Sequence, residues 1–128
     1  MAKVLIVEDD SNLRKLLASE LAKKNLSVLE AEDGEEAITK TVDEKPEIIL
    51  LDLLLPKLDG FKVLQRIRQY PDPEISSIHV VVLSNLWSDK DILQAQALKI
   101  DHYFVKANTK TEEVVQKVAS LKPVAKTA

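Results

Sequence analysis

The side chains that can do chemistry in this chain are three carboxylates, a hydroxyl and a lysine, each at or near the end of a short apolar run. The set consists of Glu8 and Asp9, followed by Asp52, Ser84 and Lys106. Three carboxylates in a small volume repel one another and are best tolerated around a hard divalent cation, Mg²⁺ or alternatively Mn²⁺. A lysine supplies compensating positive charge, and a hydroxyl beside it can donate to an anion such as a phosphoryl oxygen. These residue types indicate a metal and anion site if the fold brings the run ends together.

Asp52 lies where a charge is least expected, inside an aliphatic run from Ile48 to Leu55. A run of this kind, closed by Pro56 and by the turn signal at 59–60, is typical of a strand buried on both faces. Burial disfavours the ionised form of a carboxylate. Asp52 therefore needs a partner cation, or a reaction that modifies it. We expect it at the carboxyl end of the strand, where open parallel sheets have their ligand crevice.

Five predicted strands position these residues. They are Lys3–Val7, Ser27–Ala31, the central strand that begins at Ile48, Ile78–Leu83 and His102–Val105. Helical segments alternate with the strands, and the connections are only a few residues long. This alternation predicts an α/β fold, a doubly wound parallel sheet covered by helices on both faces, so that the carboxyl ends of the strands share one edge.

Five helices are predicted from apolar residues that recur at helical spacing. The first opens at Ser11 and is expected to bury Leu13, Leu16, Leu17 and Leu21, with Arg14 on the opposite face; the second spans Glu35–Asp43; the third follows Gly60 and is stopped by residues 70–73. The fourth is capped by Ser88 and is expected to bury Ile92, Leu93 and Leu98; the last is capped by Thr109 or Thr111 and is expected to bury Val114, Val115, Val118 and Leu121.

Length and composition exclude several classes of protein. At 128 residues the chain is expected to be one domain with a core of its own, and without cysteine it has no disulfide or thiolate metal site. A net charge of -3 gives no basic surface for direct nucleic-acid binding. No apolar stretch approaches the length of a membrane span, and no signal-peptide core is present. A cytoplasmic protein is expected.

Four motifs, in order along the chain, make a family resemblance specific. They are VLIVEDD at the first strand, LLDLLLPKLDG at the third, VVLSN at the fourth and YFVKA at the fifth. Over essentially its whole length the sequence resembles the receiver domain of two-component response regulators. The resemblance implies a flavodoxin-like (CheY-like) sheet of five parallel strands in the order 2-1-3-4-5, with five helices. We expect the receiver domain to span residues 1–122, followed by a polar tail at 123–128.

The resemblance implies that Asp52 is a phosphoacceptor, which receives a phosphoryl group from a sensor histidine kinase or a phosphotransfer protein in a magnesium-dependent reaction. It also implies that Asp9 is a direct metal ligand and Glu8 a ligand through water. Asp52 itself and the backbone carbonyl of Leu54 complete the implied ligand set. The chain would then be a signalling switch rather than an enzyme, with only self-phosphorylation and slow self-dephosphorylation at Asp52.

The resemblance assigns the remaining polar residues to the switch. Ser84 would bind the phosphoryl group, Lys106 would pair with it, and Tyr103 would change rotamer on activation. The activated state would be read by a downstream protein, or by a second copy, on the face formed by the helix after Ser88, the strand His102–Val105 and the last helix. Whether the chain acts alone or as part of a longer protein stays open from the sequence.

Three positions depart from the family pattern. Ala107 stands where the family commonly has proline after the lysine, often with a cis peptide bond, so the geometry of the Lys106–Ala107 bond is open. Asn85 replaces a very small residue after the hydroxyl. Lys99 stands where glycine is usual, which predicts a strained left-handed backbone conformation there.

Three other classes compete with this interpretation. A phosphatase of the haloacid dehalogenase type would need a second acid two residues after the nucleophile, where this chain has Leu54. A flavodoxin-type cofactor binder would need a phosphate loop after the first strand, where acids would repel a phosphate. A receiver-like interaction module that is never phosphorylated remains the main alternative, favoured if Ala107 and Asn85 distort the site.

Overall fold

A computed structural model describes residues 2–121 of the chain, so the predicted tail at 123–128 lies outside the described residues. Its centre is one parallel sheet of five strands in the order β2-β1-β3-β4-β5. The strands are β1 (Lys3–Val7), β2 (Ser27–Ala31), β3 (Ile48–Leu51), β4 (His79–Ser84) and β5 (His102–Val105). The predicted fold class and strand order are confirmed.

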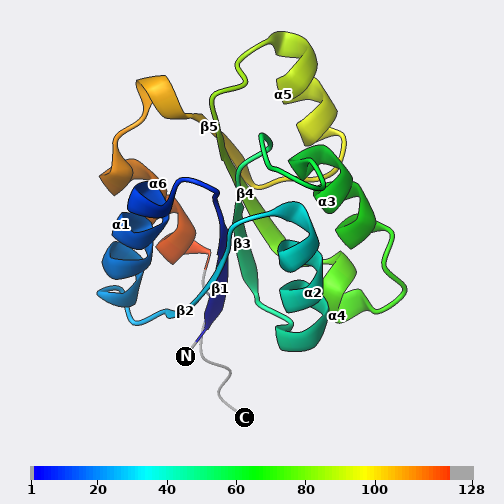
Figure 1. The fold of residues 1–128 in the computed structure, drawn as a ribbon, viewed down its shortest axis with the longest axis horizontal. Helices are drawn as coiled ribbons and strands as arrows, with labels where there is room; N and C mark the ends of the chain where they lie inside the picture. The colour runs from blue at the N-terminus through cyan, green and yellow to red at the C-terminus, as the bar shows by residue number, and fades with distance from the viewer. Residues whose placement is uncertain (1, 122–128) are drawn as a thin grey trace.

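Helices cover both faces of this sheet. They are α1 (Ser11–Ala22), α2 (Gly34–Glu44), α3 (Gly60–Arg68), α4 (Pro73–Ser76), α5 (Asp89–Gln96) and α6 (Thr111–Ser120), with a short 3-10 turn, η1 (Lys106–Asn108). Helices α1 and α6 lie on one side, and α2, α3, α4 and α5 lie on the other (Figure 1). No described helix is long and apolar enough to cross a membrane.

The alternation of side chains along the strands divides the core between the two faces. On β1, Val4 and Ile6 pack with Leu17 of α1 in one cluster, whereas Leu5 and Val7 belong to the other. The residues that α3 contributes to that second cluster are Val63, Leu64 and Ile67. Every strand residue from Ile48 to Leu51 is buried, so β3 forms the fully covered centre of the sheet, as its aliphatic sequence predicts.

The expected helix count of five was one short. The segment expected only to stop the third helix contains α4, a single turn begun by Pro73 and capped by Asp72, whose carboxylate accepts from the Glu74 N–H. Proline at the first helical position is compatible with a helix because its missing N–H would have no partner there. The turn buries Ile75.

Several side-chain predictions for the helices were wrong. Leu16 is 47% exposed and Leu93 is 64% exposed, although both were expected to be buried, and Arg14, expected in solvent, is buried. Neither predicted threonine caps α6: Thr111 is its first residue, and the hydroxyl of Thr109 donates to the Val105 carbonyl.

Two glycines allow loops to approach the helix ends closely. A Cβ on Gly60 would lie 2.4 Å from the Leu53 Cα and 2.5 Å from the Asp52 carbonyl oxygen. A Cβ on Gly34 would lie 1.9 Å from the Leu58 carbonyl oxygen. Because both neighbours are backbone, a side chain at either position would displace the loop that follows β3.

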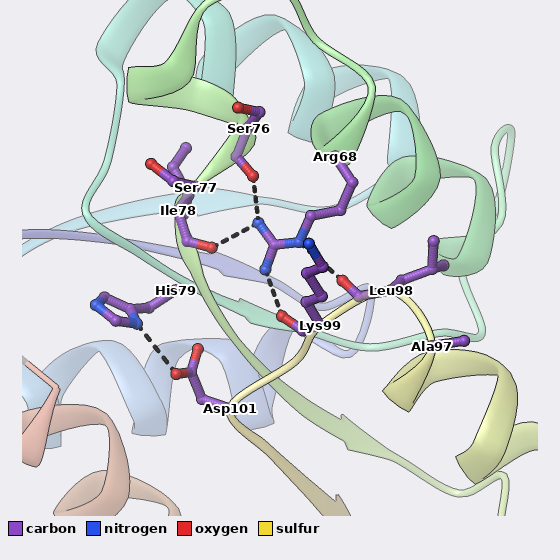
Figure 2. Close-up of a pocket in the computed structure, with 9 residues that line it drawn as sticks. All are labelled: Arg68, Ser76, Ser77, Ile78, His79, Ala97, Leu98, Lys99 and Asp101. Carbon is purple, nitrogen blue, oxygen red and sulfur yellow. Dashed lines mark hydrogen bonds and ion pairs between the residues drawn. The ribbon is translucent and has the colours of Figure 1, made fainter.

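Arg68, the last residue of α3, links this helix to the segment before β4 and to the segment after α5, at the end of the sheet where β4 and β5 begin. Its guanidinium donates to four carbonyl oxygens, those of Ser76 and Ile78 before β4 and those of Leu98 and Lys99 after α5, at 2.7–2.9 Å. Arg68, at the end of α3, lines a hollow of about 490 Å³, and Figure 2 shows its guanidinium pointing toward these carbonyls. Nearby, Asp101 accepts from the Val80 N–H and pairs with His79.

Candidate functional site

The predicted site residues meet at the carboxyl edge of the sheet, where β1, β3, β4 and β5 end. Carboxylate oxygens of Glu8, Asp9 and Asp52 lie within 4.8 Å of one another. Glu8 and Asp9 directly follow β1, and Asp52 directly follows β3, which ends at Leu51. Neighbouring parallel strands thus bring together acids that are more than 40 residues apart in sequence.

Lys106, directly after β5, connects two of these acids. Its ammonium lies 2.7 Å from Glu8 Oε1 and 2.8 Å from Asp52 Oδ2. Glu8 and Asp52 are almost fully buried, so this one cation compensates two desolvated carboxylates. The contact between Lys106 and Glu8 was not predicted, because the sequence does not indicate which of the acids a single lysine would reach.

The ionisation of the cluster reflects burial and pairing together. Burial raises the pKa of Glu8 and outweighs the hydrogen bond from Lys106, which acts in the opposite direction. Burial disfavours the charged form of Lys106, but its hydrogen bonds to Asp52 and Glu8 prevail and raise the pKa of the ammonium. The lysine therefore stays charged in the crevice at neutral pH.

Backbone groups hold the acids in place. The Asp52 N–H donates to the Val7 carbonyl, and the Leu54 N–H donates to Asp52 Oδ1 at 3.0 Å. The loop after β3 therefore folds around the carboxylate instead of continuing the strand, although its sequence stays aliphatic as far as Leu55. The carbonyl of Leu54 remains a predicted metal ligand.

Ser84 and Tyr103 are linked through a single residue, Leu86. The Leu86 N–H donates to Ser84 Oγ at 3.3 Å, and the Tyr103 hydroxyl donates to the Leu86 carbonyl at 2.7 Å. Burial raises the pKa of the Tyr103 phenol. The hydroxyl at the end of β4 and the aromatic on β5 thus share one peptide segment.

The departures from the family pattern leave the side chains of the site in place. The Lys106–Ala107 peptide bond is trans, and it opens the turn η1. Asn85 is exposed to solvent. Lys99 has φ 61°, the left-handed conformation that the sequence predicted.

Arg14 is the residue near the site that sequence reasoning missed. Its guanidinium donates to the Glu8 carbonyl at 2.9 Å and to Glu30 Oε1, also at 2.9 Å. A signal was present in the spacing, because Arg14 precedes the buried Leu17 and Leu21 by three and seven residues and so shares their helical face.

The donor set fits a hard divalent cation, because all three converging groups offer carboxylate oxygens and Asp9 remains exposed toward the crevice. Softer metals prefer sulfur or imidazole ligands, and no cysteine or histidine contributes to this described cluster.

Known proteins resemble this chain over most of its length. The family model described as "Response regulator receiver domain" matches residues 4–119. The transcriptional regulatory protein ResD of Bacillus subtilis is 32% identical over 126 residues, which are 98% of this chain and 50% of that protein. The DNA-binding dual master transcriptional regulator RpaA of Synechocystis is 34% identical over 121 residues, which are 94% of this chain and 49% of that protein. The chain thus spans about half the length of these curated relatives.

Solved structures share the fold. The Mn²⁺-bound form of response regulator Rcp1 is 30% identical, with a TM-score of 0.80 and full coverage of both chains. The chemotaxis response regulator CheY4 of Vibrio cholerae, at 23% identity, supports the fold alone, with a TM-score of 0.83 over 94% of this chain and 98% of that one. The chain belongs to the receiver-domain family of two-component response regulators.

Proposed function

We propose that the chain is a phosphoacceptor switch in which Asp52 receives a phosphoryl group from the phosphohistidine of a sensor kinase or a phosphotransfer protein, in the cytoplasm. The observation that carries this proposal is the position of Asp52, a buried carboxylate that touches Lys106 and lies within reach of two further acids. A carboxylate oxygen of Asp52 forms the O–P bond as the P–N bond to the donor imidazole breaks, and the imidazole keeps the electron pair.

The acids would hold the metal on which this transfer depends. Asp9 is proposed as a direct ligand, Glu8 as a ligand through water, and Asp52 with the Leu54 carbonyl as the remaining protein ligands. A bound Mg²⁺ or Mn²⁺ supplies neutralising charge to the phosphoryl oxygens. The protein contributes orientation, since the fold gathers the carboxylate oxygens of Glu8, Asp9 and Asp52 within 4.8 Å of one another.

Lys106 and Ser84 are proposed to bind the transferred group. The Lys106 ammonium lies 2.8 Å from the accepting carboxylate, so it can follow the negative charge outward onto the phosphoryl oxygens. Ser84 Oγ accepts a hydrogen bond from the Leu86 N–H, which leaves its own hydroxyl proton to donate to a phosphoryl oxygen. Drawing Ser84 toward Asp52 would pull on Leu86 and hence on the hydroxyl of Tyr103.

The output is proposed to lie on the face of α5, β5 and α6, where a downstream protein or a second copy would bind. Helix α5 is the favoured moving part, because Ala95 is its one buried residue. Trp87, just before it, is 74% exposed, and Leu93 is 64% exposed. Apolar side chains in solvent beside the switch pair offer a contact surface whose position depends on Tyr103.

We also propose that the aspartyl phosphate is long-lived. Leu54 and Leu86, two residues beyond the acceptor and the hydroxyl, line one groove of the surface, and neither side chain can orient a water in line with the phosphorus. Orienting that water is most of what a protein contributes to this hydrolysis.

The test is incubation with a small phosphodonor and Mg²⁺, read by intact mass. Wild type should gain one phosphoryl group, and Asp52→Asn should gain none. Asp59→Asn is the matched control, because the Asp59 carboxylate caps α3 by accepting from the Lys62 N–H and does not belong to the described acid cluster. A folded wild type that gains no mass would favour the alternative, a receiver-like interaction module that is not phosphorylated.

A further inference from the structure

Arg14 contacts the loop that carries Glu8 and Asp9 through the loop's backbone rather than through its carboxylates. Its side chain is only 9% exposed, and its partners come from two different places: the carbonyl of Glu8 in the loop after β1, and the carboxylate of Glu30 on β2. A third acid, Glu32, lies 4.0 Å from Nη2. A buried guanidinium with this many partners is held rigidly, because its planar fork satisfies several acceptors at fixed angles.

The bond to the Glu8 carbonyl acts directly on the two predicted metal ligands. That carbonyl belongs to the planar peptide unit that joins Glu8 to Asp9, so fixing its oxygen fixes the direction in which the chain leaves Glu8 and enters Asp9. Other bonds anchor the same turn, since the Glu8 N–H donates to the Ala31 carbonyl and the Asp10 N–H donates to Glu8 Oε2.

Glu8 thus contacts two cations through two different groups. Lys106 contacts its carboxylate, and Arg14 donates to its backbone carbonyl. The lysine must release or share that carboxylate if a divalent cation is to use it. Arg14 has no such competing role, because its partners are the peptide carbonyl and the acids on or just beyond β2.

We propose that Arg14 is a positioning residue for the divalent-cation site, which it supports by orienting the Glu8–Asp9 peptide and thereby aiming both carboxylates into the crevice. The proposal rests on the metal site of the proposed function. Mutation of a residue that hydrogen-bonds to a metal ligand, rather than to the metal itself, commonly lowers metal affinity by a factor of ten or more.

Positioning and simple electrostatics predict opposite signs, which makes the proposal testable. Removing a positive charge near three carboxylates should tighten cation binding if only the field matters. Removing the peptide anchor should weaken it. Arg14→Met removes both the charge and the anchor and keeps much of the stem, whereas Arg14→Lys keeps the charge and loses the fork that spans Glu8 and Glu30.

The experiment measures binding of Mn²⁺ alone by electron paramagnetic resonance of the free ion, at neutral pH. Arg14→Met is expected to bind about tenfold more weakly than wild type, and Arg14→Lys should show an intermediate loss. Lys15→Met is the matched control: Lys15 neighbours Arg14 on α1 and pairs with the same Glu30 oxygen at 3.5 Å, but its side chain is 69% exposed. It should bind as wild type or slightly more tightly.

Two different failures can be told apart. If wild type and Arg14 variants bind Mn²⁺ equally, or the methionine variant binds more tightly, Arg14 has no positioning role although the metal site stands. If wild type binds no Mn²⁺, the metal site itself is refuted, and this inference with it. Should Arg14→Met fail to fold by circular dichroism, Arg14→Lys decides, because equal affinity in a folded lysine variant contradicts the proposal.

Discussion

Replacing Lys99 by glycine should stabilise the protein, because the backbone at this position is left-handed. Lys99 has φ 61°, a conformation in which the Cβ of an L-residue crowds the following carbonyl. The residue cannot relax out of it, since its N–H donates to the Gln96 carbonyl at 3.0 Å and its own carbonyl accepts from Arg68 at 2.8 Å. Glycine can keep both bonds without the steric cost.

The magnitude is the difference between two effects. Relief of the left-handed strain is worth about 1–2 kcal/mol, and the greater freedom of glycine in the unfolded chain takes back about 0.4–1 kcal/mol. Taking the middle of each range, the free energy of unfolding should rise by about 0.8 kcal/mol. In a chain of this size that corresponds to an increase of about 2–4 °C in Tm.

Urea and thermal unfolding of three proteins separate the backbone effect from the side chain. Lys99→Ala removes the charged side chain but keeps the Cβ, so it should match wild type, and Lys99→Gly should exceed both. A glycine variant no more stable than wild type would refute the strain argument. Equal gains from alanine and glycine would show instead that the lysine side chain is unfavourable.

Three further results are expected. Leu54→Asn/Leu86→Glu should lose its phosphoryl group faster than wild type after donor removal in Mg²⁺, and equal decay would show that the two leucines do not set the lifetime. Burial raises the pKa of the Tyr103 phenol above its ordinary value of 10.0. Its contribution to the free energy of unfolding is therefore fully present below pH 10 and is lost as pH rises through the folded-state pKa. Tyr103→Phe should accordingly flatten the alkaline fall of the urea midpoint, and parallel falls would contradict this. Gly60→Ala should lower the free energy of unfolding by about 1–3 kcal/mol, because its Cβ would lie 2.4 Å from the Leu53 Cα; an unchanged midpoint would mean that the loop yields freely.

The sheet was predictable because each strand corresponds to a separate aliphatic run in the sequence. Three of the five have the predicted bounds, and β4 is shifted by one residue. The gathering of Glu8, Asp9 and Asp52 followed from this, since parallel strands bring their carboxyl ends to one edge. The roles assigned to these residues stay predictions until phosphorylation and metal binding are measured.

Helix faces were harder to predict, because periodicity records hydrophobicity and not what lies opposite. Leu93 fits the apolar pattern of α5, yet that helix has little of the protein against it and leaves the side chain in solvent. Arg14 interrupts the apolar pattern of α1, yet it is buried because its guanidinium donates to the Glu8 carbonyl and to the Glu30 carboxylate. Periodicity reveals neither the missing contacts around Leu93 nor the two acceptors of Arg14, which lie 6 and 16 residues away in the sequence.

The four carbonyl bonds of Arg68 bear on how long the native state lasts once formed. Two of them join residues 30 and 31 positions apart, and all four exist only when α3, the segment before β4 and the segment after α5 are assembled together (Figure 2). Contacts that close such long loops are costly to form early in folding. Interactions made after the folding barrier slow unfolding and leave the folding rate nearly unchanged. We therefore expect Arg68 to slow unfolding more than it speeds folding, at the end of the sheet opposite the carboxylates, and so to extend the lifetime of the fold without touching the chemistry.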